Sequence, residues 1–138
     1  MGSGIAEVAA LSGCDVKVVE ANEGALEAGM ARIEKSLDRA VRAQKMTDDQ
    51  RSEVMGKISF STKLPSLADR EFVVEAVIEQ EDAKLEVFGR LNDVVDDPEA
   101  VLASNTSSIP IMKLAMATNR PQQAVSYTQL TLPTILLV

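Results

Sequence analysis

The sequence predicts an α/β fold with a mainly parallel sheet and helices on both of its faces. Short apolar segments typical of strands alternate with longer segments in which apolar residues recur every three or four positions, as one face of a helix requires. One strand candidate, residues 71–78 (EFVVEAVI), is almost continuously apolar, which is typical of a parallel strand covered on both faces. A chain of 138 residues with 46% hydrophobic and 25% charged residues suits one globular domain.

The first half of the chain begins with a predicted helix, a strand and a long helix. Residues 2–12 start with small residues and are followed by Gly13, which predicts a helix, and residues 15–20 (DVKVVE) predict a strand that ends on a carboxylate. Asn22 is a suitable N-cap for a helix that runs to about Gln44. The apolar residues of that helix have helical spacing: Leu26, Met30, Ile33, Leu37 and Val41.

A second helix follows, so that a helical pair is inserted between two predicted strands. Thr47 is its expected N-cap, residues 48–55 form it and Gly56 ends it. Residues 57–62 (KISFST) alternate as a strand does. The later elements are a strand over 71–78, a helix over 81–95, a strand over 101–104, a polar turn over 105–108, and a last helix from Pro110 to about Ala117.

Composition excludes several classes of function. The net charge of −7, from 14 Lys and Arg against 21 Asp and Glu, argues against binding to nucleic acid or to an anionic membrane. No apolar stretch is long enough to span a bilayer, and residues 1–4 lack the basic region of a signal peptide. The single cysteine, Cys14, excludes an internal disulfide and fits the reducing cytoplasm. Without histidine the chain offers neither an imidazole base nor a histidine ligand, and we expect no metal site.

Polar side chains follow or end several predicted strands, where α/β sheets bind their ligands. Glu20 ends the strand over 15–20, Glu75 and Glu79 lie at the end of the strand over 71–78, and residues 104–108 (SNTSS) follow next. Because the carboxyl ends of parallel strands share one edge of a sheet, we expect these groups to converge there.

Glu20 and the glycines at the start of the chain have the spacing of a dinucleotide-binding domain. Glu20 lies 18 residues after Gly2, and such a domain places an acid about 20 residues beyond its glycine loop, where the acid accepts hydrogen bonds from ribose hydroxyls. Gly2 and Gly4 would let a pyrophosphate approach the helix N-terminus. The alternative is a solvated carboxylate and glycines that only permit close packing.

Three further positions have both a functional and a structural interpretation. Lys84 is expected on the inner side of its helix near the N-terminus, where its charge calls for an anionic ligand or Glu79, unless the side chain snorkels to solvent. Ser107 and Ser108 either stabilise a helix cap and turn or place a hydroxyl at a substrate oxygen. Ser36 either belongs with Gly29 and Ala43, seven residues to either side, to a strip of small residues for helix contact or, with its basic neighbours, touches a phosphate-bearing ligand.

Three motifs together resemble a known family. They are residues 1–6 (MGSGIA), 73–79 (VVEAVIE) and 103–108 (ASNTSS). In order and spacing they resemble the Rossmann-like NAD-binding domain of 3-hydroxyacyl-CoA dehydrogenases, especially the bacterial 3-hydroxybutyryl-CoA dehydrogenases, over residues 1–125. The resemblance implies an oxidoreductase that interconverts (S)-3-hydroxyacyl-CoA and 3-ketoacyl-CoA with NAD, in fatty-acid or butanoate metabolism.

The resemblance also implies roles for single residues. The residues implied to contact NAD are Met1 and Gly2, at the end of a G-x-G-x-M-G loop, Glu20 at the adenosine ribose, the backbone near Val77, and Glu79, Lys84 and Ser107. Ser107 would also hydrogen-bond the hydroxyl or keto oxygen of the substrate, and Ser36 would contact CoA. A CoA-contacting lysine of some members falls on Ala43 here, so Arg42 or Lys45 would have to replace it.

Both ends of the chain depart from the family pattern. The family has a strand and G-x-G before the position of Met1, and after Val125 it continues into a G-L-H-F-F-N-P segment whose histidine is the general acid and base. We therefore expect a partial domain over residues 1–125 with its first strand missing, and a non-family tail of artefactual origin over residues 126–138. Such a fragment would be inactive, and its parent a homodimer through a later helical domain. The alternative is a non-catalytic nucleotide-binding module.

Overall fold

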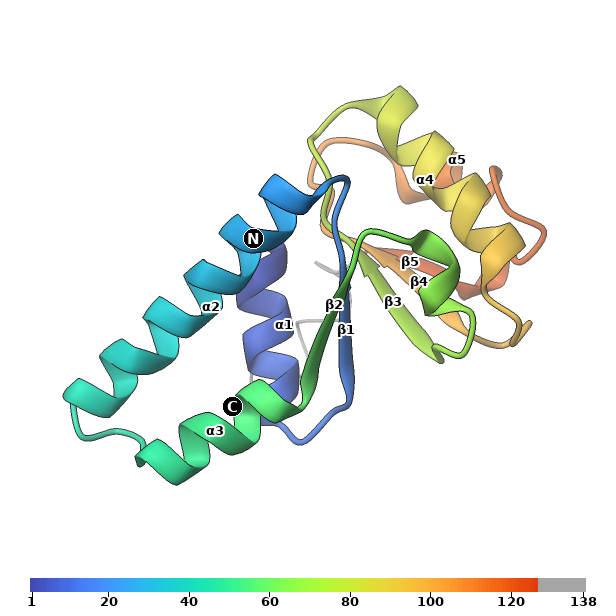
Figure 1. Cartoon of the computed structure of the whole chain (residues 1–138). Helices are drawn as coiled ribbons and strands as arrows, with labels where there is room; N and C mark the ends of the chain where they lie inside the picture. The colour runs from blue at the N-terminus through green and yellow to red at the C-terminus, as the bar shows by residue number, and fades with distance from the viewer. Residues whose placement is uncertain (127–138) are drawn as a thin grey trace. The chain divides into compact units, whose positions relative to one another are not determined.

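A computed structural model describes residues 1–126 of the chain (Figure 1). The predicted non-family tail, residues 126–138, lies outside the described residues except for Ser126. Contacts between Cα atoms divide the chain into two compact units, Met1–Ser66 and Leu67–Val138.

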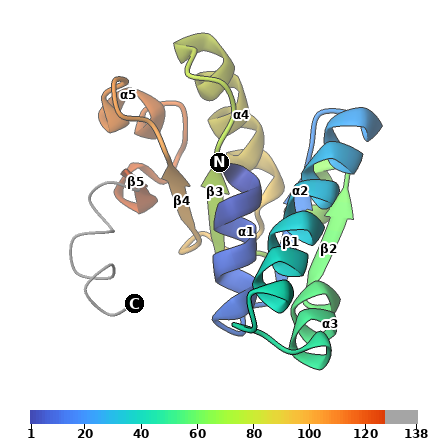
Figure 2. The same cartoon turned by 90° about the vertical axis from the view of Figure 1, so that its left-hand side faces the viewer.

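The first unit is a two-stranded parallel sheet with three helices. Its elements in chain order are α1 (Gly2–Leu11), β1 (Val16–Val19), α2 (Glu23–Arg42), α3 (Asp48–Gly56), β2 (Ile58–Ser61) and a 3₁₀ turn, η1 (Leu64–Leu67), which crosses into the next unit. In the β1–β2 ladder Val16 lies opposite Ile58 and Val19 opposite Ser61. The predicted helical pair, α2 and α3, is confirmed between these two strands, and Figure 2 shows α1 and α2 running alongside one another.

Both predicted N-caps of the helical pair are confirmed. The Asn22 side chain accepts a hydrogen bond from the Ala25 N–H and so satisfies one of the free donors at the start of α2. Thr47 and Gln50 form a capping box at the start of α3, in which each side chain accepts a hydrogen bond from the backbone N–H of the other residue. These side chains fix the points at which the chain enters each helix.

The core of the first unit lies between the helices and the strand pair. Two of the five residues predicted on one face of the long helix, Ile33 and Leu37, are fully buried there. The remaining buried members come from α1, α3 and β2: Ala6, Ala10, Val54 and Ile58. The 3.6-residue period of α2 therefore has the packing consequence that the sequence predicts.

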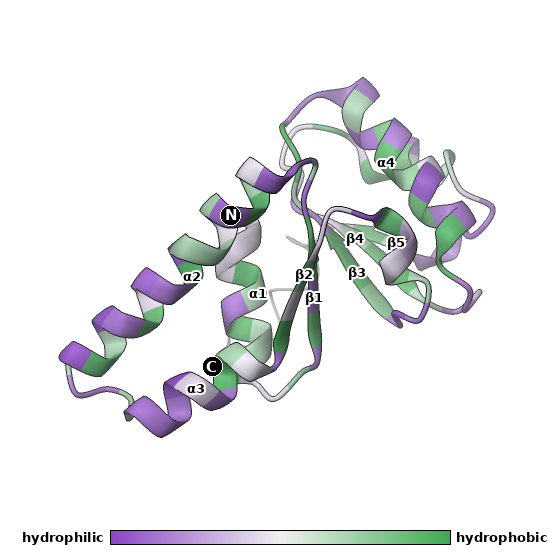
Figure 3. Cartoon of the chain, in the orientation of Figure 1, coloured by the Kyte–Doolittle hydropathy of each residue, from purple (hydrophilic) through white to green (hydrophobic). Residues whose placement is uncertain are grey.

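The second unit is a three-stranded parallel sheet in the order β3-β4-β5. Its elements are β3 (Phe72–Glu75), α4 (Glu81–Val94), β4 (Val101–Ser104), α5 (Ile111–Ala115), a 3₁₀ turn, η2 (Pro121–Gln123), and β5 (Ala124–Ser126). Hydrophobic residues concentrate in these strands, as Figure 3 shows. The central strand β4 contributes Leu102 and Ala103 to the core, and α4 contributes Phe88 and Leu91.

Two expectations differ from the structure, and three short elements were not predicted. The strand predicted over 71–78 ends at Glu75, because the Glu75 carboxylate accepts the Val77 N–H and turns the backbone out of the extended form. Coverage on both faces is also wrong for the ends of that apolar segment, since Phe72 and Ile78 are exposed. The sequence analysis did not predict η1, η2 and β5, which are only three or four residues long and offer too few positions to show a period.

All strand pairs among residues 1–126 are parallel, which confirms the predicted α/β class. Within the described part of the chain, β1 has a neighbour on one side only, β2, and β3 likewise has only β4. In parallel sheets the ligand-binding side chains sit beyond the carboxyl ends of the strands. Each unit has such an end, which Glu20 follows in the first unit and which Glu75 and Ser104 form in the second.

Candidate functional site

In the first unit, the start of α1 and the end of β1 lie at the same end of that unit. Only residues 12–15 connect α1 to β1, and the two elements pack against each other, so the chain must reverse direction between them. The Gly4 and Ile5 N–H groups donate to the Met1 carbonyl at 3.0 and 3.2 Å. Gly2 and Ser3 have no backbone acceptor among residues 1–126, which leaves two N–H donors suited to an anion such as a pyrophosphate.

Glu20 follows β1 at this end. Its N–H donates to the Ser61 carbonyl at 3.1 Å, which holds the backbone, and its side chain is half-buried. The carboxylate lies against the buried side of α2, because a Cβ placed at Gly29 would lie 3.5 Å from Glu20 Oε1, an ordinary van der Waals contact. No hydrogen bond engages that carboxylate among the residues that the structure describes, so its oxygens can accept from ribose hydroxyls. The donors of α1 and this acceptor together fit the two halves of an adenosine diphosphate group.

In the second unit, the end of β3 carries a buried ion pair between Glu75 and Lys84. The two side chains have no exposed surface, and Lys84 Nζ lies 2.8 Å from Glu75 Oε1 and 3.0 Å from Glu75 Oε2. The interpretation that Lys84 snorkels to solvent is therefore wrong. The interpretation in which Glu79 compensates the lysine is correct in part, because Glu79 Oε2 lies 3.5 Å from Lys84 Nζ. Glu75 is the nearer partner.

Lys84 Nζ also joins the backbone segments that leave β3 and β4. It donates to Asn105 Oδ1 at 3.2 Å and to the Val77 carbonyl at 3.3 Å. The Val77 N–H in turn donates to Glu75 Oε1 at 2.6 Å. Both backbone groups of Val77 are thus bonded within the chain, and the contacts of Val77 and Lys84 with NAD stay predictions.

Glu79 holds the loop that follows β4. Its Oε1 accepts hydrogen bonds from the Thr106 hydroxyl, from the Ser108 hydroxyl at 2.9 Å and from the Ser108 N–H at 3.4 Å. The hydrogen bond from Thr106, with further contributions from Ser108 and the charge of Lys84, lowers the pKa of Glu79 from 4.5 to about 2, against the opposing effect of desolvation. The side chain is 40% exposed, so an ionised carboxylate faces solvent at this edge.

Ser107 lies between the two residues that Glu79 holds. Its side chain is exposed, and within the described residues its hydroxyl makes no hydrogen bond. The neighbouring turn is stabilised instead by Thr106, whose Oγ1 accepts the Ile109 N–H at 3.0 Å, and Pro110 is the N-cap of α5. The predicted hydroxyl-stabilised turn is therefore made by Thr106, and the Ser107 hydroxyl stays free to meet a substrate oxygen.

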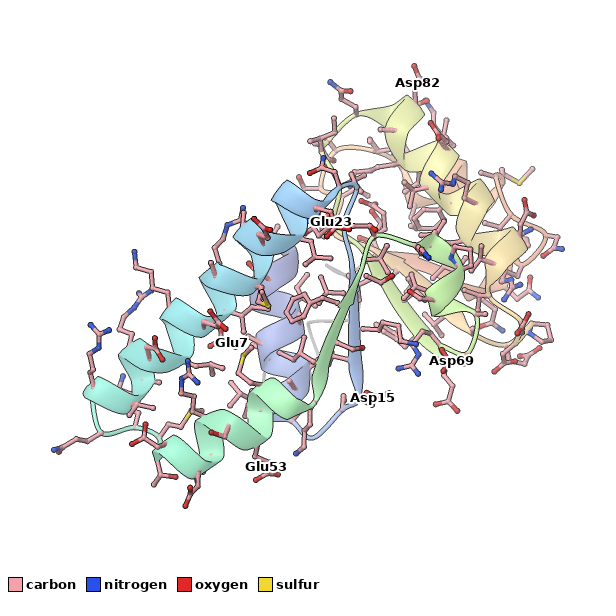
Figure 4. The ribbon with its side chains drawn as sticks, viewed as in Figure 1. Glu7, Asp15, Glu23, Glu53, Asp69 and Asp82 are labelled. Atoms are coloured by element: carbon pink, nitrogen blue, oxygen red, sulfur yellow. The ribbon has the colours of Figure 1, made fainter. Side chains whose placement is uncertain are left out.

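Ser36 lies on α2 and faces α1. Its hydroxyl donates to Glu7 Oε1 at 2.9 Å, and Figure 4 labels Glu7 on α1. This contact supports the interpretation of a small-residue strip for helix contact, although Ala43 falls just beyond the helix as its C-cap. The role of Ser36 in binding CoA stays a prediction, with a serine oxygen that can still accept a hydrogen bond.

Residues 104–108 were predicted at the polar end of the second unit's strands, but Ser104 and Thr106 had no predicted role there. Ser104 Oγ donates to Glu75 Oε2 at 2.6 Å and accepts the Thr106 N–H at 3.1 Å, so both Ser104 and Thr106 belong to the buried network. The signal was a serine at the end of an otherwise apolar strand, where a buried hydroxyl needs a partner. Glu20 belongs to the first unit and Glu75, Glu79 and residues 104–108 to the second.

Two further features are absent from residues 1–126. Among residues 1–126 no group of three or more His, Cys, Asp or Glu side chains could hold a metal ion. No helix in that part of the chain has the length and apolar character needed to cross a membrane.

A parallel α/β structure with free donors at its first helix and an acid after the following strand defines the class of dinucleotide-binding domains. The sequence matches the family described as "3-hydroxyacyl-CoA dehydrogenase, NAD binding domain" over residues 1–129. The chain belongs to this family, which confirms the predicted resemblance, the Rossmann-like fold and NAD as the cofactor.

Similar proteins and solved structures agree with this assignment. A 3-hydroxybutyryl-CoA dehydrogenase of Mycobacterium tuberculosis is 54% identical over 125 residues, which are 91% of this chain and 44% of that protein. The crystal structure of M. tuberculosis FadB2 matches with a TM-score of 0.88 at 55% identity, over 91% of this chain and 44% of the other. The (S)-3-hydroxybutyryl-CoA dehydrogenase PaaH1 of Ralstonia eutropha matches with the same TM-score at 33% identity and the same coverage. The chain thus spans less than half the length of these relatives.

Proposed function

We propose that this chain is the NAD-binding part of an oxidoreductase that interconverts (S)-3-hydroxyacyl-CoA and 3-ketoacyl-CoA with NAD(H). The observation that carries the proposal is the free, exposed hydroxyl of Ser107 at the carboxyl end of β4, held between two residues bound to Glu79. A dehydrogenase of this kind needs a fixed polar group beside the carbon that gains or loses hydride. The family and the names of the relatives support the substrate class.

The residues of the first unit would bind the adenosine half of the cofactor. The N–H groups of Gly2 and Ser3 would donate to the pyrophosphate, next to Met1, and the Glu20 carboxylate would accept hydrogen bonds from the ribose hydroxyls. When bound, NAD supplies the hydride acceptor, and the protein supplies orientation and electrostatics.

The residues of the second unit would orient the reacting atoms. Ser107 would donate to the keto oxygen of the substrate, or accept from the hydroxyl of the reduced form, and so fix the reacting carbon in place. The ionised Glu79, together with Val77 and Lys84, would form the edge against which the cofactor lies. Ser36 on α2 would contact the CoA part of the substrate.

The reaction also needs a group that transfers the proton of the substrate hydroxyl. The chain has no histidine, so these residues provide no imidazole for that step. The same observation favours a second function, a non-catalytic nucleotide-binding module. For the first function we further propose that the parent protein is cytoplasmic and a homodimer, works in fatty-acid or butanoate metabolism, and joins the partial NAD-binding domain over residues 1–125 to a later helical domain.

Titration of the 138-residue chain with NADH, with and without acetoacetyl-CoA, tests both functions. Cofactor fluorescence would report binding, and the dehydrogenase function predicts that acetoacetyl-CoA raises the affinity for NADH, because both ligands meet at Ser107. The Ser107→Ala variant should bind NADH but lose this coupling. Binding of NADH that acetoacetyl-CoA does not change favours the binding module, and no binding of NADH contradicts both functions.

A further inference from the structure

Glu75 is a buried carboxylate to which the proposed function gives no role. Its Oε1 accepts from the Val77 N–H and from Lys84, and its Oε2 accepts from Lys84 and from the Ser104 hydroxyl. Each oxygen therefore accepts two hydrogen bonds, and the donors come from three different segments of the second unit. We propose that Glu75 is a positioning residue, which fixes the loop over 105–108 and thereby the place of the Ser107 hydroxyl.

The first connection from Glu75 to the loop passes through Ser104. The Ser104 hydroxyl donates a hydrogen bond to Glu75 Oε2 at 2.6 Å. The lone pairs of the Ser104 oxygen remain available, and that oxygen accepts a hydrogen bond from the Thr106 N–H at 3.1 Å. The backbone adds a parallel link, because the Asn105 N–H donates to the Glu75 carbonyl at 3.2 Å. Ser104 is fully buried, so water does not compete for these bonds.

The second connection passes through Lys84. Its ammonium group, held by Glu75, donates to Asn105 Oδ1 at 3.2 Å and lies 3.5 Å from Glu79 Oε2. Glu79 in turn accepts from the hydroxyls of Thr106 and Ser108, the two neighbours of Ser107. Glu75 thus reaches both sides of Ser107 without contacting Ser107 itself.

Only a carboxylate of this length satisfies all the donors. Glutamine at position 75 offers one acceptor oxygen, and its amide N–H₂ would face donors, so Ser104 or Lys84 would lose its partner. The buried lysine would then lose its nearest counter-charge and keep that of Glu79, 3.5 Å away and partly exposed. The importance of the loop for substrate binding rests on the proposed function, but the fixing of the loop by Glu75 does not.

Two variants separate positioning from simple stabilisation. Ser104→Ala cuts the first connection and keeps the ion pair intact. The double variant Glu75→Leu/Lys84→Met removes every side-chain acceptor and donor of the pair, so it cuts both connections and leaves no unpaired charge, which protects the fold where Glu75→Gln alone would not. Glu86→Gln is the matched control. Glu86 is an exposed carboxylate on α4, the helix that carries Lys84, and it lies 3.8 Å from Arg90 in an ion pair.

Hydrogen exchange of single amides, measured by NMR on the 138-residue chain without ligand, is the first readout. We expect the Thr106 and Ile109 amides to exchange at least tenfold faster in both variants, relative to the amides of Leu102 and Ala103 in β4. Glu86→Gln should leave this ratio unchanged. If the loop amides and the β4 amides accelerate by the same factor, the pair only stabilises the unit and the proposal is overturned.

The affinity of the folded chain for NADH is the second readout, because a merely stabilising residue would not alter it. Ser104→Ala is the variant for this readout, because Ser104 is not among the proposed cofactor contacts whereas Lys84 is. At a temperature where Ser104→Ala is fully folded, we expect at least fivefold weaker binding than in the wild type. Wild-type affinity in Ser104→Ala contradicts a positioning role in cofactor binding. If the wild-type chain itself does not bind NADH, the proposed function fails, and the exchange ratio alone decides whether Glu75 positions the loop.

Discussion

Glu75 and Lys84 face each other at 2.8 Å with no exposed surface on either side chain, between the carboxyl end of β3 and the start of α4. A buried ion pair stabilises a fold little more than an apolar pair of equal size does. The loss of one partner, however, leaves the other charge unpaired in a medium of low polarity. The pair therefore makes the energetics of the site depend on both residues together.

The first prediction concerns the stability of single and double variants of this pair. Lys84→Met should lower the free energy of unfolding by about 3–5 kcal/mol, because Glu75 keeps a buried charge without its cation. The double variant Glu75→Gln/Lys84→Met should recover more than half of that loss. Urea unfolding followed by circular dichroism measures both.

Lys113→Met provides the matched control for that prediction. Lys113 Nζ also lies 2.9 Å from a carboxylate oxygen, that of Glu81, but both side chains are about half exposed. An exposed pair contributes about 0–1 kcal/mol, so the same substitution should cost no more than that. Equal losses at Lys84 and Lys113 would show that burial of the Glu75–Lys84 pair does not matter.

The second prediction is a loss of stability in acid that depends on Glu79. The pKa of Glu79 is about 2 in the folded chain and 4.5 when the group is unperturbed. A lowered pKa stabilises the folded chain above pH 4.5, and this contribution falls as the pH drops from 4.5 towards 2. The pKa of Glu53, lowered by its hydrogen bond with Lys57, acts in the same direction.

Unfolding free energies measured between pH 2 and pH 6 check this sign. In the Glu79→Gln variant the slope of stability against pH should be shallower over the acid range, because the variant lacks the titrating group. Glu53 lies on α3 and is labelled in Figure 4, and the Glu53→Gln variant should flatten the slope less. A slope identical in the wild type and in Glu79→Gln would mean that Thr106 and Ser108 do not hold an ionised carboxylate.

The third prediction concerns the choice between NADH and NADPH. A carboxylate at the adenosine ribose accepts from its hydroxyls and repels a 2′-phosphate. Glu20→Ala should therefore weaken NADH binding about tenfold, the equivalent of about 1.4 kcal/mol, while NADPH binding weakens less or improves. Glu27→Ala, at an exposed carboxylate on α2, is the control. Loss of affinity for both cofactors by the same factor would contradict the contact between Glu20 and the ribose.

The fourth prediction concerns Arg120, a buried residue after α5. Its guanidinium donates to the carbonyls of Asn92 at 3.2 Å and Val95 at 3.0 Å and to that of Asp97, and so closes the carboxyl end of α4. Arg120→Met should destabilise the chain by about 2–4 kcal/mol, since it leaves these carbonyls without a charged donor. The stability of Arg120→Lys, which has fewer donors than arginine, should lie between that of the wild type and that of Arg120→Met. A melting temperature unchanged in Arg120→Met would contradict this role.

Sequence periodicity predicted the elements that have room for a pattern. The 20-residue helix α2 shows its buried face in Ile33 and Leu37, and Asn22 and Thr47 mark helix starts through the hydrogen bonds that their side chains accept. The end of β3 was less predictable, since only the hydrogen bond from the Val77 N–H to the Glu75 side chain stops the strand. Such a contact between a side chain and its own turn leaves no trace in an apolar pattern.

The candidate site was predictable where residues lie at strand ends and less so where they meet through space. Glu79 and Ser107 were found from their positions after β3 and β4. The burial of Lys84 was not, because a lysine on the inner side of a helix either snorkels or pairs, and the choice depends on Glu75, nine residues away in the chain. The roles of Ser104 and Thr106 became recognisable only once the register placed Glu75 opposite Ser104.

The most direct test of the account is a titration of the 138-residue chain with NADH, followed in a ¹H–¹⁵N NMR spectrum. We expect saturable binding, with shifts that include the amides of Gly2 and Ser3 at the start of α1 and of Glu20 after β1. We also expect shifts at Ser107, in the loop after β4. A spectrum that stays unchanged up to millimolar NADH would contradict the assignment of these residues to a cofactor site.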